Sequence, residues 1–222
     1  MAEKIKQGDH VEVVYIGRDK NSGKIFDLND EETAKKEDIY NPKYNYESTV
    51  ICVGKRDVVE GFDEALIGKD VGSKFTISIK PEKAFGNKNP KLFRLVPASK
   101  FKERPFPGMP VEINGRQAMV KTVSGGRIML DFNHPLAGKE IEYEINVKRK
   151  VTDDKEKLDS FMKMYLNSSP KTEIQEDKAI IHYDIPEKFR GDIEKIIKER
   201  IPKIKKIEFK TSEAPKNSSK KE

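Results

Sequence analysis

The residues that could do chemistry are aromatic and acidic side chains at two places in the first third of the chain. At one place Phe26 directly precedes Asp27, in a short segment that is predicted to be extended. At the other, Phe62, Ala65 and Leu66 follow the i, i+3, i+4 spacing that predicts one apolar face of a short helix. The sequence thus predicts a short helix with an aromatic residue on its inner face beside a sheet.

We interpret Val58, Val59 and Phe62 as the floor of an apolar cleft and neighbouring strands as its walls. On pattern alone, the favoured interpretation is that Phe62 is an ordinary core residue. His10 and His134 are isolated in sequence, and we interpret both as structural.

Alternation of apolar and polar residues predicts the strands that position the cleft. The segments with this pattern are 11–16, 48–54, 74–80 and 140–150. The last strand needs a sheet, and its candidate partners all precede Pro81. Between them, residues 87–133 carry several prolines and short β-like runs, joined by the hairpin signals Asn114-Gly115 and Gly125-Gly126. We therefore interpret 87–133 as a small all-β unit that interrupts one domain, and the charged stretch 29–47 as a surface loop.

Composition narrows the class of protein. The chain has 222 residues, a net charge of +6 and a pI of about 9.1, and its charges of both signs interleave, which is typical of a solvated surface. The single cysteine, Cys52, cannot form a disulfide framework, which indicates a reducing compartment. The N-terminal residues lack the apolar stretch of a signal peptide, and no apolar run approaches membrane-spanning length. We expect a cytoplasmic protein with no membrane partner.

Several motifs together resemble the FKBP-type peptidyl-prolyl cis-trans isomerases, and more closely the SlyD-like and long archaeal members that carry an insert-in-flap (IF) domain. The motifs are Gly8-Asp9 through Tyr15, Phe26-Asp27, Val53-Gly54, Val58 to Phe62, Ala65-Leu66, Val71-Gly72, Ala84-Phe85-Gly86 and Asn133 to Gly138. The resemblance covers about residues 1–151.

The resemblance implies an α+β fold, in which an FKBP-type antiparallel twisted sheet wraps on a short helix. The sheet domain would be discontinuous, with a small inserted all-β domain and a C-terminal α+β domain. The expected limits are 1–86 with 134–151 for the catalytic domain, 87–133 for the IF domain, 152–210 for the C-terminal domain and 211–222 for a disordered tail.

The resemblance also implies an isomerase site that needs no metal and no cofactor. The residues that match the family's pocket positions are Tyr15, Phe26, Asp27, Val58, Val59, Phe62, Phe85 and Tyr143. Phe85 stands where the family usually has tyrosine, so a hydroxyl donor to a bound carbonyl is missing and tight inhibitor binding is not expected. Asp27 would be the polar partner of a tilted carbonyl or of the pocket's hydrogen-bond network, and its alternative is a solvated turn aspartate.

The predicted IF domain has more apolar residues than so small a unit needs for its core. They are Leu92, Phe93, Leu95, Val96, Phe101, Phe106, Met109, Met119 and Met129. One interpretation is a surface that holds unfolded or partly folded polypeptides containing X-Pro bonds, because methionine is common at adaptable binding surfaces. The other is a compact core, and the sequence leaves both open.

Residues after 151 predict a small α+β domain with helices at 155–166 and 187–200. Its few strands favour an exposed sheet edge, so a homodimer through this domain is plausible. It contains a single histidine, His182, so the histidine-rich metal-binding tail of some SlyD-like proteins is absent.

Two alternatives to an isomerase remain at this point. The first is a non-catalytic chaperone that keeps the FKBP scaffold, which the Phe85 position favours. The second is an RNA- or ribosome-associated protein, because basic residues outnumber acidic ones between 87 and 133. Attraction of acidic client segments or mere solubility would explain the same excess, so a nucleic-acid partner is considered unlikely.

Overall fold

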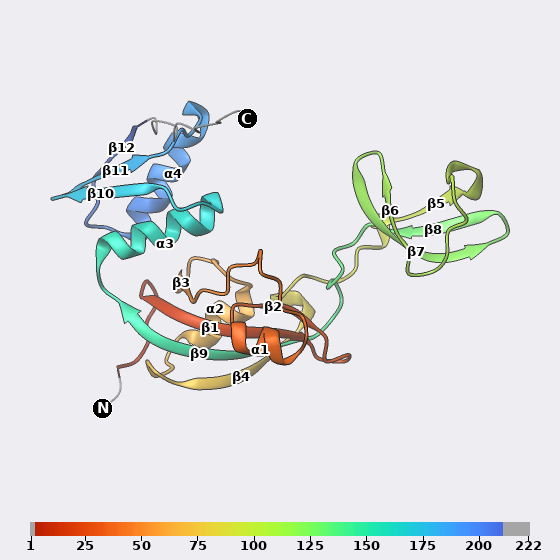
Figure 1. Cartoon of the computed structure of the whole chain (residues 1–222), viewed down its shortest axis with the longest axis horizontal. Coiled ribbons are helices and arrows are strands. Elements are labelled where there is room, and N and C mark those ends of the chain that lie inside the picture. Colours follow the sequence, from red (N-terminus) through yellow and green to blue (C-terminus); the bar gives the residue numbers. More distant parts are fainter. Residues whose placement is uncertain (1–2, 211–222) are drawn as a thin grey trace, which may run out of the picture. The chain divides into compact units, whose positions relative to one another are not determined.

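The computed structural model describes residues 3–210, and the tail predicted at 211–222 lies outside them. The structure is of the α+β class and its main sheet has five strands, which confirms the predicted fold class. These strands are β1 (His10–Asp19), β2 (Ile25–Leu28), β3 (Thr49–Cys52), β4 (Lys74–Ile79) and β9 (Ile141–Val151). Their order is β2-β1-β9-β4, and β3 pairs antiparallel with β1 (Figure 1).

The chain packs as two compact units. Of the described residues, one unit contains 3–16, 27–77 and 144–210, and the other contains 17–26 and 78–143. The division passes within β1, between Phe26 and Asp27 in β2, and within β4 and β9. The domain limits expected from the sequence stay predictions, and the two units are described separately below.

In the first unit, the short helix α2 (Glu60–Leu66) carries the apolar face that the sequence predicts. Phe62 is 1% exposed and Leu66 is fully buried. The carboxylate of Asp63 accepts hydrogen bonds from the backbone N–H groups of Gly54 (2.7 Å) and Arg56 (3.0 Å), which fixes the loop before the helix. A buried carboxylate is tolerated here because it is hydrogen-bonded.

A second short helix, α1 (Glu31–Lys36), lies within the stretch 29–47 that was expected to be a loop. The Asp30 side chain caps it by accepting from the backbone N–H of Thr33 at 3.1 Å. The loop prediction is therefore wrong for 31–36, because a side-chain cap outweighed the charged composition.

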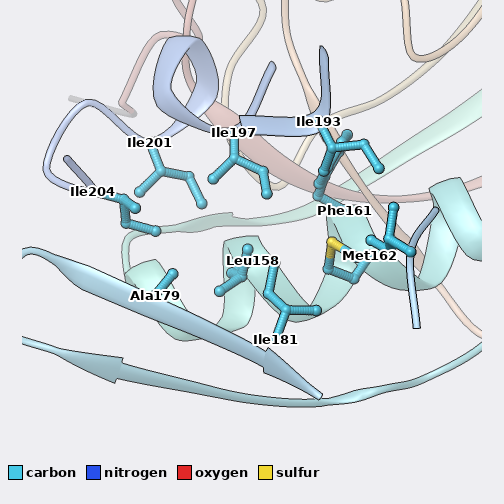
Figure 2. Packing of buried hydrophobic residues seen from close by; sticks show 10 residues of the cluster. Leu158, Phe161, Met162, Ala179, Ile181, Ile193, Ile197, Ile201 and Ile204 are labelled. Carbon is cyan, nitrogen blue, oxygen red and sulfur yellow. The ribbon is translucent and has the colours of Figure 1, made fainter. Parts of the chain in front are cut away.

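The C-terminal part of the first unit is a three-stranded sheet covered on one face by two helices. Its elements are α3 (Asp154–Leu166), β10 (Lys171–Gln175), β11 (Lys178–His182), α4 (Glu187–Arg200) and β12 (Lys206–Lys210). β11 lies between β10, with which it pairs antiparallel, and β12, with which it pairs parallel. Figure 2 shows the core that joins them: Leu158 and Met162 of α3 and Ile193 and Ile197 of α4 meet Ile181 of β11. These residues recur at helical spacing, as expected for helices with one buried face.

The second unit contains an antiparallel four-stranded sheet in the order β5-β8-β7-β6. The strands are β5 (Phe93–Pro97), β6 (Pro110–Ile113), β7 (Arg116–Ser124) and β8 (Arg127–Asp131). Both predicted hairpin turns form, and Asn114, Gly115, Gly125 and Gly126 all have positive φ, as two-residue type I′ turns require. The core of this sheet consists of Ala118, Val120, Ile128 and Leu130. Short 3-10 helices cover Pro81–Lys83, Pro90–Leu92 and Ala98–Lys100.

Across residues 3–210, no helix has both the length and the apolar character needed to cross a bilayer.

Candidate active site

In the first unit, Tyr15 and Phe62 form the aromatic contact of the candidate site. Tyr15 comes from β1 and Phe62 from α2, and their rings meet edge to face with centroids 5.6 Å apart and an interplanar angle of 85°. This arrangement is a favourable one for aromatic pairs. Phe62 is buried like a core residue and its ring contacts Tyr15, while its place in a cleft stays a prediction.

The Asp27 carboxylate accepts a hydrogen bond from the hydroxyl of Tyr15. Burial raises the pKa of the Asp27 carboxyl, and hydrogen bonds from the Tyr15 hydroxyl and the Leu28 backbone act in the opposite direction. A partly buried carboxylate bonded to a phenol is not the solvated turn aspartate of the alternative interpretation. Its charge also raises the pKa of Tyr44, although burial of that hydroxyl is the larger cause.

A buried side-chain amide, that of Asn29, holds the backbone of β1 at Val13 and Tyr15, and the sequence analysis missed it. Its Oδ1 accepts from the Tyr15 backbone N–H at 2.7 Å, and its Nδ2 donates to the Val13 carbonyl and to Thr49 Oγ1, both at 3.1 Å. The side chain is 5% exposed and its polar atoms are bonded to β1 and β3. A single asparagine in a charged stretch carries no sequence signal for such a role.

Val58 and Val59 are both half-buried and precede α2, with Val59 at its N-cap position. Val58 lines a groove together with Tyr15 and Tyr44. The neighbouring Asp57 is 4% exposed in its side chain and accepts from the Cys52 backbone N–H at 2.8 Å. The loop that presents the two valines is therefore anchored by buried carboxylates on either side.

In the second unit, Phe26 is the centre of an aromatic cluster. The centroid of its ring lies 5.8 Å from that of Phe85 and 5.7 Å from that of Tyr143, with interplanar angles of 86° and 81°. Gly17 of β1 makes room for two of these rings, since a Cβ there would lie 2.7 Å from Tyr143 Cε1 and 2.9 Å from Phe26 Cζ. Sequence reasoning missed Gly17, because its neighbours come from β2 and β9.

His134, predicted to be structural, is exposed and stacks on Phe85 with centroids 4.6 Å apart and an interplanar angle of 6°. It thus belongs to the aromatic cluster and not to the core. Its Nδ1 accepts from the Leu136 backbone N–H at 3.2 Å, which fixes the ring orientation.

The structure thus brings Tyr15, Asp27 and Phe62 together in one unit, and Phe26, Phe85 and Tyr143 together in the other. Two further titratable residues of the first unit, Cys52 and His10, are buried. Burial raises the pKa of the Cys52 thiol to about 11, and burial together with the nearby charges of Lys157 and Arg200 lowers the pKa of His10 to about 4. Within residues 3–210, no group of three or more His, Cys, Asp or Glu side chains is placed to hold a metal ion. What the site offers is aromatic surface and one carboxylate.

Comparison with known proteins agrees with this geometry. A family model described as FKBP-type peptidyl-prolyl cis-trans isomerase matches residues 1–101, and a model described as FKBP26, IF domain, matches residues 94–136. The chain is 39% identical over 151 residues to the short-type peptidyl-prolyl cis-trans isomerase of Methanocaldococcus jannaschii, which covers 67% of this chain and 95% of that protein.

Two bacterial relatives match shorter stretches. The probable FKBP-type 16 kDa peptidyl-prolyl cis-trans isomerase of Pseudomonas fluorescens is 35% identical over 101 residues, which covers 43% of this chain and 67% of that protein. The FKBP-type peptidyl-prolyl cis-trans isomerase SlyD of Treponema pallidum is 32% identical over 109 residues, which covers 44% of this chain and 60% of that protein. With an aromatic site, an inserted β sheet and these relatives, the chain belongs to the FKBP-type peptidyl-prolyl cis-trans isomerase family and is an isomerase of that type.

Proposed function

We propose that this isomerase accelerates proline-limited folding of polypeptide clients, which it holds through apolar residues of the β5–β8 sheet. The observation that carries the chaperone part is exposure: Leu95 is 60% exposed and Phe106 is 62% exposed. Apolar side chains left uncovered in this way mark partner sites when they gather on one small unit.

The apolar residues predicted for client binding divide into three groups. Val96, Phe101 and Met109 pack against the core of the sheet, as the compact-core interpretation expects. Leu95, Phe106 and Met119 are exposed, while the others are half-buried, namely Leu92, Phe93 and Met129.

Strand register explains the division. Val96 pairs with the buried Ile128, and Leu95 pairs with Met129 one position away. Successive side chains of a strand point to opposite faces, so Leu95 and Met129 lie together on the face away from the core. This face is the candidate client surface.

The isomerisation step requires no bond to a nucleophile. The barrier is the loss of amide resonance, about 18–20 kcal/mol. The twisted amide has less charge on its carbonyl oxygen than the planar one, so an apolar aromatic site stabilises it relative to water. We propose that Tyr15, Phe26, Phe62 and Tyr143 supply that surface and that the Asp27 carboxylate orients the substrate through the Tyr15 hydroxyl.

Val58, Val59 and Phe85 would complete the substrate contacts. Phe85 has no hydroxyl, so we expect weak binding of inhibitors that need a donor at this position. Catalysis depends on the apolar shape of the pocket, so we expect it to persist without this hydroxyl.

A double variant, Leu95→Ser with Phe106→Ser, tests the chaperone part. Tetrapeptide isomerisation should stay at the wild-type rate, while the kcat/KM for refolding of a proline-limited protein falls about tenfold, or 1.4 kcal/mol, because two apolar contacts are lost. Phe189→Ser is the matched control, since Phe189 is 45% exposed on α4. Equal losses on both substrates, or the same loss in the control, would contradict a client role for this sheet.

Three further expectations stay predictions. A cytoplasmic location fits the single buried thiol of Cys52. A homodimer would use the free edges of β10 or β12. The RNA-binding alternative is the third; Lys88 and Lys121, two of the basic residues behind it, lie within ion-pair distance of Asp131.

A further inference from the structure

A groove of about 700 Å³ in the first unit connects candidate pocket residues with the C-terminal helices. Tyr15 and Val58 line it at the pocket, and Tyr44 lines it from the segment before β3. Ser160 and Met164 line it from α3, which packs against β3. Candidate site residues Tyr15 and Val58 thus share one groove with α3, which lies outside the residues matched by the two family models.

The α3 side of the groove is firmly attached. Arg200 Nη1 of α4 lies 2.5 Å from Asp57 Oδ1, directly before Val58, and the two side chains are only 12% and 4% exposed. Ion pairs this deeply buried have little freedom to rearrange without a large cost. The Arg200 guanidinium also lies over the Phe161 ring of α3, 5.0 Å from its centroid.

A second attachment is made by charged residues that line the groove. Arg149 of β9 contacts Glu12 of β1 (Nε to Oε2, 2.6 Å) and Glu156 of α3 (Nη1 to Oε2, 3.1 Å). Lys163 of α3 pairs with Glu47 at the opposite segment. Because these charges are paired with one another, the groove does not have the excess positive charge that a nucleic acid would need.

The rest of the lining suits an extended polypeptide. Met164 is 37% exposed and Tyr44 is 51% exposed, and both offer apolar surface to a ligand. Asn45 and Asn167 line the same groove and carry side-chain amides, which can bond a peptide backbone in either direction. Methionine adapts to many side chains, as a surface for varied sequences requires.

We propose that α3 and the segment before β3 form an extended subsite that binds client residues flanking the prolyl bond. The subsite gives the C-terminal α+β part a role in substrate selection. This inference rests on the proposed function, because the groove matters only if the prolyl bond is held at Tyr15 and Val58.

The test compares short and long substrates in the full-length chain. Met164→Glu places a charge on the apolar part of the subsite, and Met164→Ala removes the side chain conservatively. Phe189→Glu is the matched control, an exposed aromatic residue of the same region that does not line the groove. The substrates are an X-Pro tetrapeptide and peptides of about fifteen residues with one X-Pro bond, extended on one side or the other, long enough at about 3.3 Å per residue to leave the pocket.

The subsite predicts that Met164→Glu raises KM for one set of long peptides about fivefold, with kcat unchanged and the tetrapeptide unaffected. Met164→Ala should raise the same KM less, and Phe189→Glu not at all. Unchanged KM for all long peptides, or an equal loss on the tetrapeptide, would overturn the inference while leaving isomerase activity in place. Loss of a dimer in Met164→Glu, measured by sedimentation, would instead assign this face to a second copy of the chain and also overturn it. Wild-type failure on the tetrapeptide would refute the proposed function itself.

Discussion

Replacing Arg200 with methionine tests whether the C-terminal helices support the loop of the candidate active site. In the structure, the guanidinium contacts Asp57 Oδ1 at 2.5 Å and lies over the Phe161 ring. Methionine keeps most of the side-chain volume and removes the charge. The Asp57 carboxylate, 4% exposed in its side chain, then retains the hydrogen bond from the Cys52 backbone N–H but loses its counter-ion.

The expected loss follows from burial. Removing one member of a buried ion pair typically costs about 3–5 kcal/mol, because the other charge remains buried. The remaining hydrogen bond from Cys52 places this case at the lower end, about 3 kcal/mol, or roughly a hundredfold in the equilibrium for opening the loop. Asp57→Asn removes the orphaned charge, so the double variant should recover to within about 1 kcal/mol of wild type.

The pH dependence of the stability loss in Arg200→Met provides a second check. Burial already raises the pKa of Asp57, and loss of Arg200 raises it further. Below this raised pKa, the Asp57 carboxyl of the folded protein is protonated and no buried unpaired charge remains. The loss of unfolding free energy in Arg200→Met should therefore become smaller as the pH falls below that pKa.

Urea unfolding gives the global free energy, and amide exchange at Cys52 gives the local one, because that N–H bonds directly to Asp57. All four members of the double-mutant cycle should be measured at neutral and acidic pH. A loss below about 1 kcal/mol in Arg200→Met, or a coupling energy near zero, would refute the claim that this pair anchors the loop.

Three other predictions concern single residues. If the ionised form of Asp27 supports catalysis, kcat/KM should decline as the pH falls through its raised pKa, and Asp27→Asn should flatten the pH profile; identical profiles would count against it. The hydrogen bond from Lys139, with those of the backbone, lowers the pKa of Asp19 to about 2. The ionised Asp19 therefore stabilises the folded state above the unfolded pKa of about 4, and this contribution is lost between about pH 4 and pH 2. An acid titration of the unfolding free energy of Asp19→Asn should lack this loss. Gly17→Ala should reduce kcat/KM about tenfold and destabilise the folded state by about 1–3 kcal/mol, because a Cβ would lie 2.7 Å from an aromatic carbon. Gly191→Ala in α4 is the matched control, since a Cβ there meets nothing within 4 Å. Equal behaviour of the two variants in calorimetry and activity would be contrary to this account.

Local chemistry made parts of the fold predictable. The Asn114-Gly115 and Gly125-Gly126 pairs adopt the positive φ angles that define their hairpins. The helix predicted at 187–200 has those limits, since Pro186 precedes its first turn and isoleucines at helical spacing face the core.

What could not be predicted depends on residues that are distant in sequence. Gly17 is required because rings from two other strands pass over it. Asn29 has a structural role only once β1 and β3 lie side by side. Arg200 and Asp57 are 143 positions apart, and neither lies in a motif that indicates its partner. Such contacts follow from the finished fold, so they carry no periodic pattern in the sequence.

The pocket residues were a different case, because the resemblance supplied them and composition did not. The structure places six of the eight in direct aromatic or hydrogen-bonded contact with another of the set, within one unit or the other; they are Tyr15, Asp27, Phe62, Phe26, Phe85 and Tyr143. Their roles in the reaction remain predictions that only activity can test.

The most direct test of the central claim is catalysis of a proline-limited refolding reaction by the wild type, Phe26→Ala and Asp27→Ala. The wild type should accelerate the slow phase, which takes tens to hundreds of seconds without catalyst. Each variant should lose about tenfold or more in kcat/KM while its circular dichroism spectrum stays that of the folded chain. Wild-type rates in both variants would contradict the assignment of this aromatic and carboxylate site to the isomerase reaction.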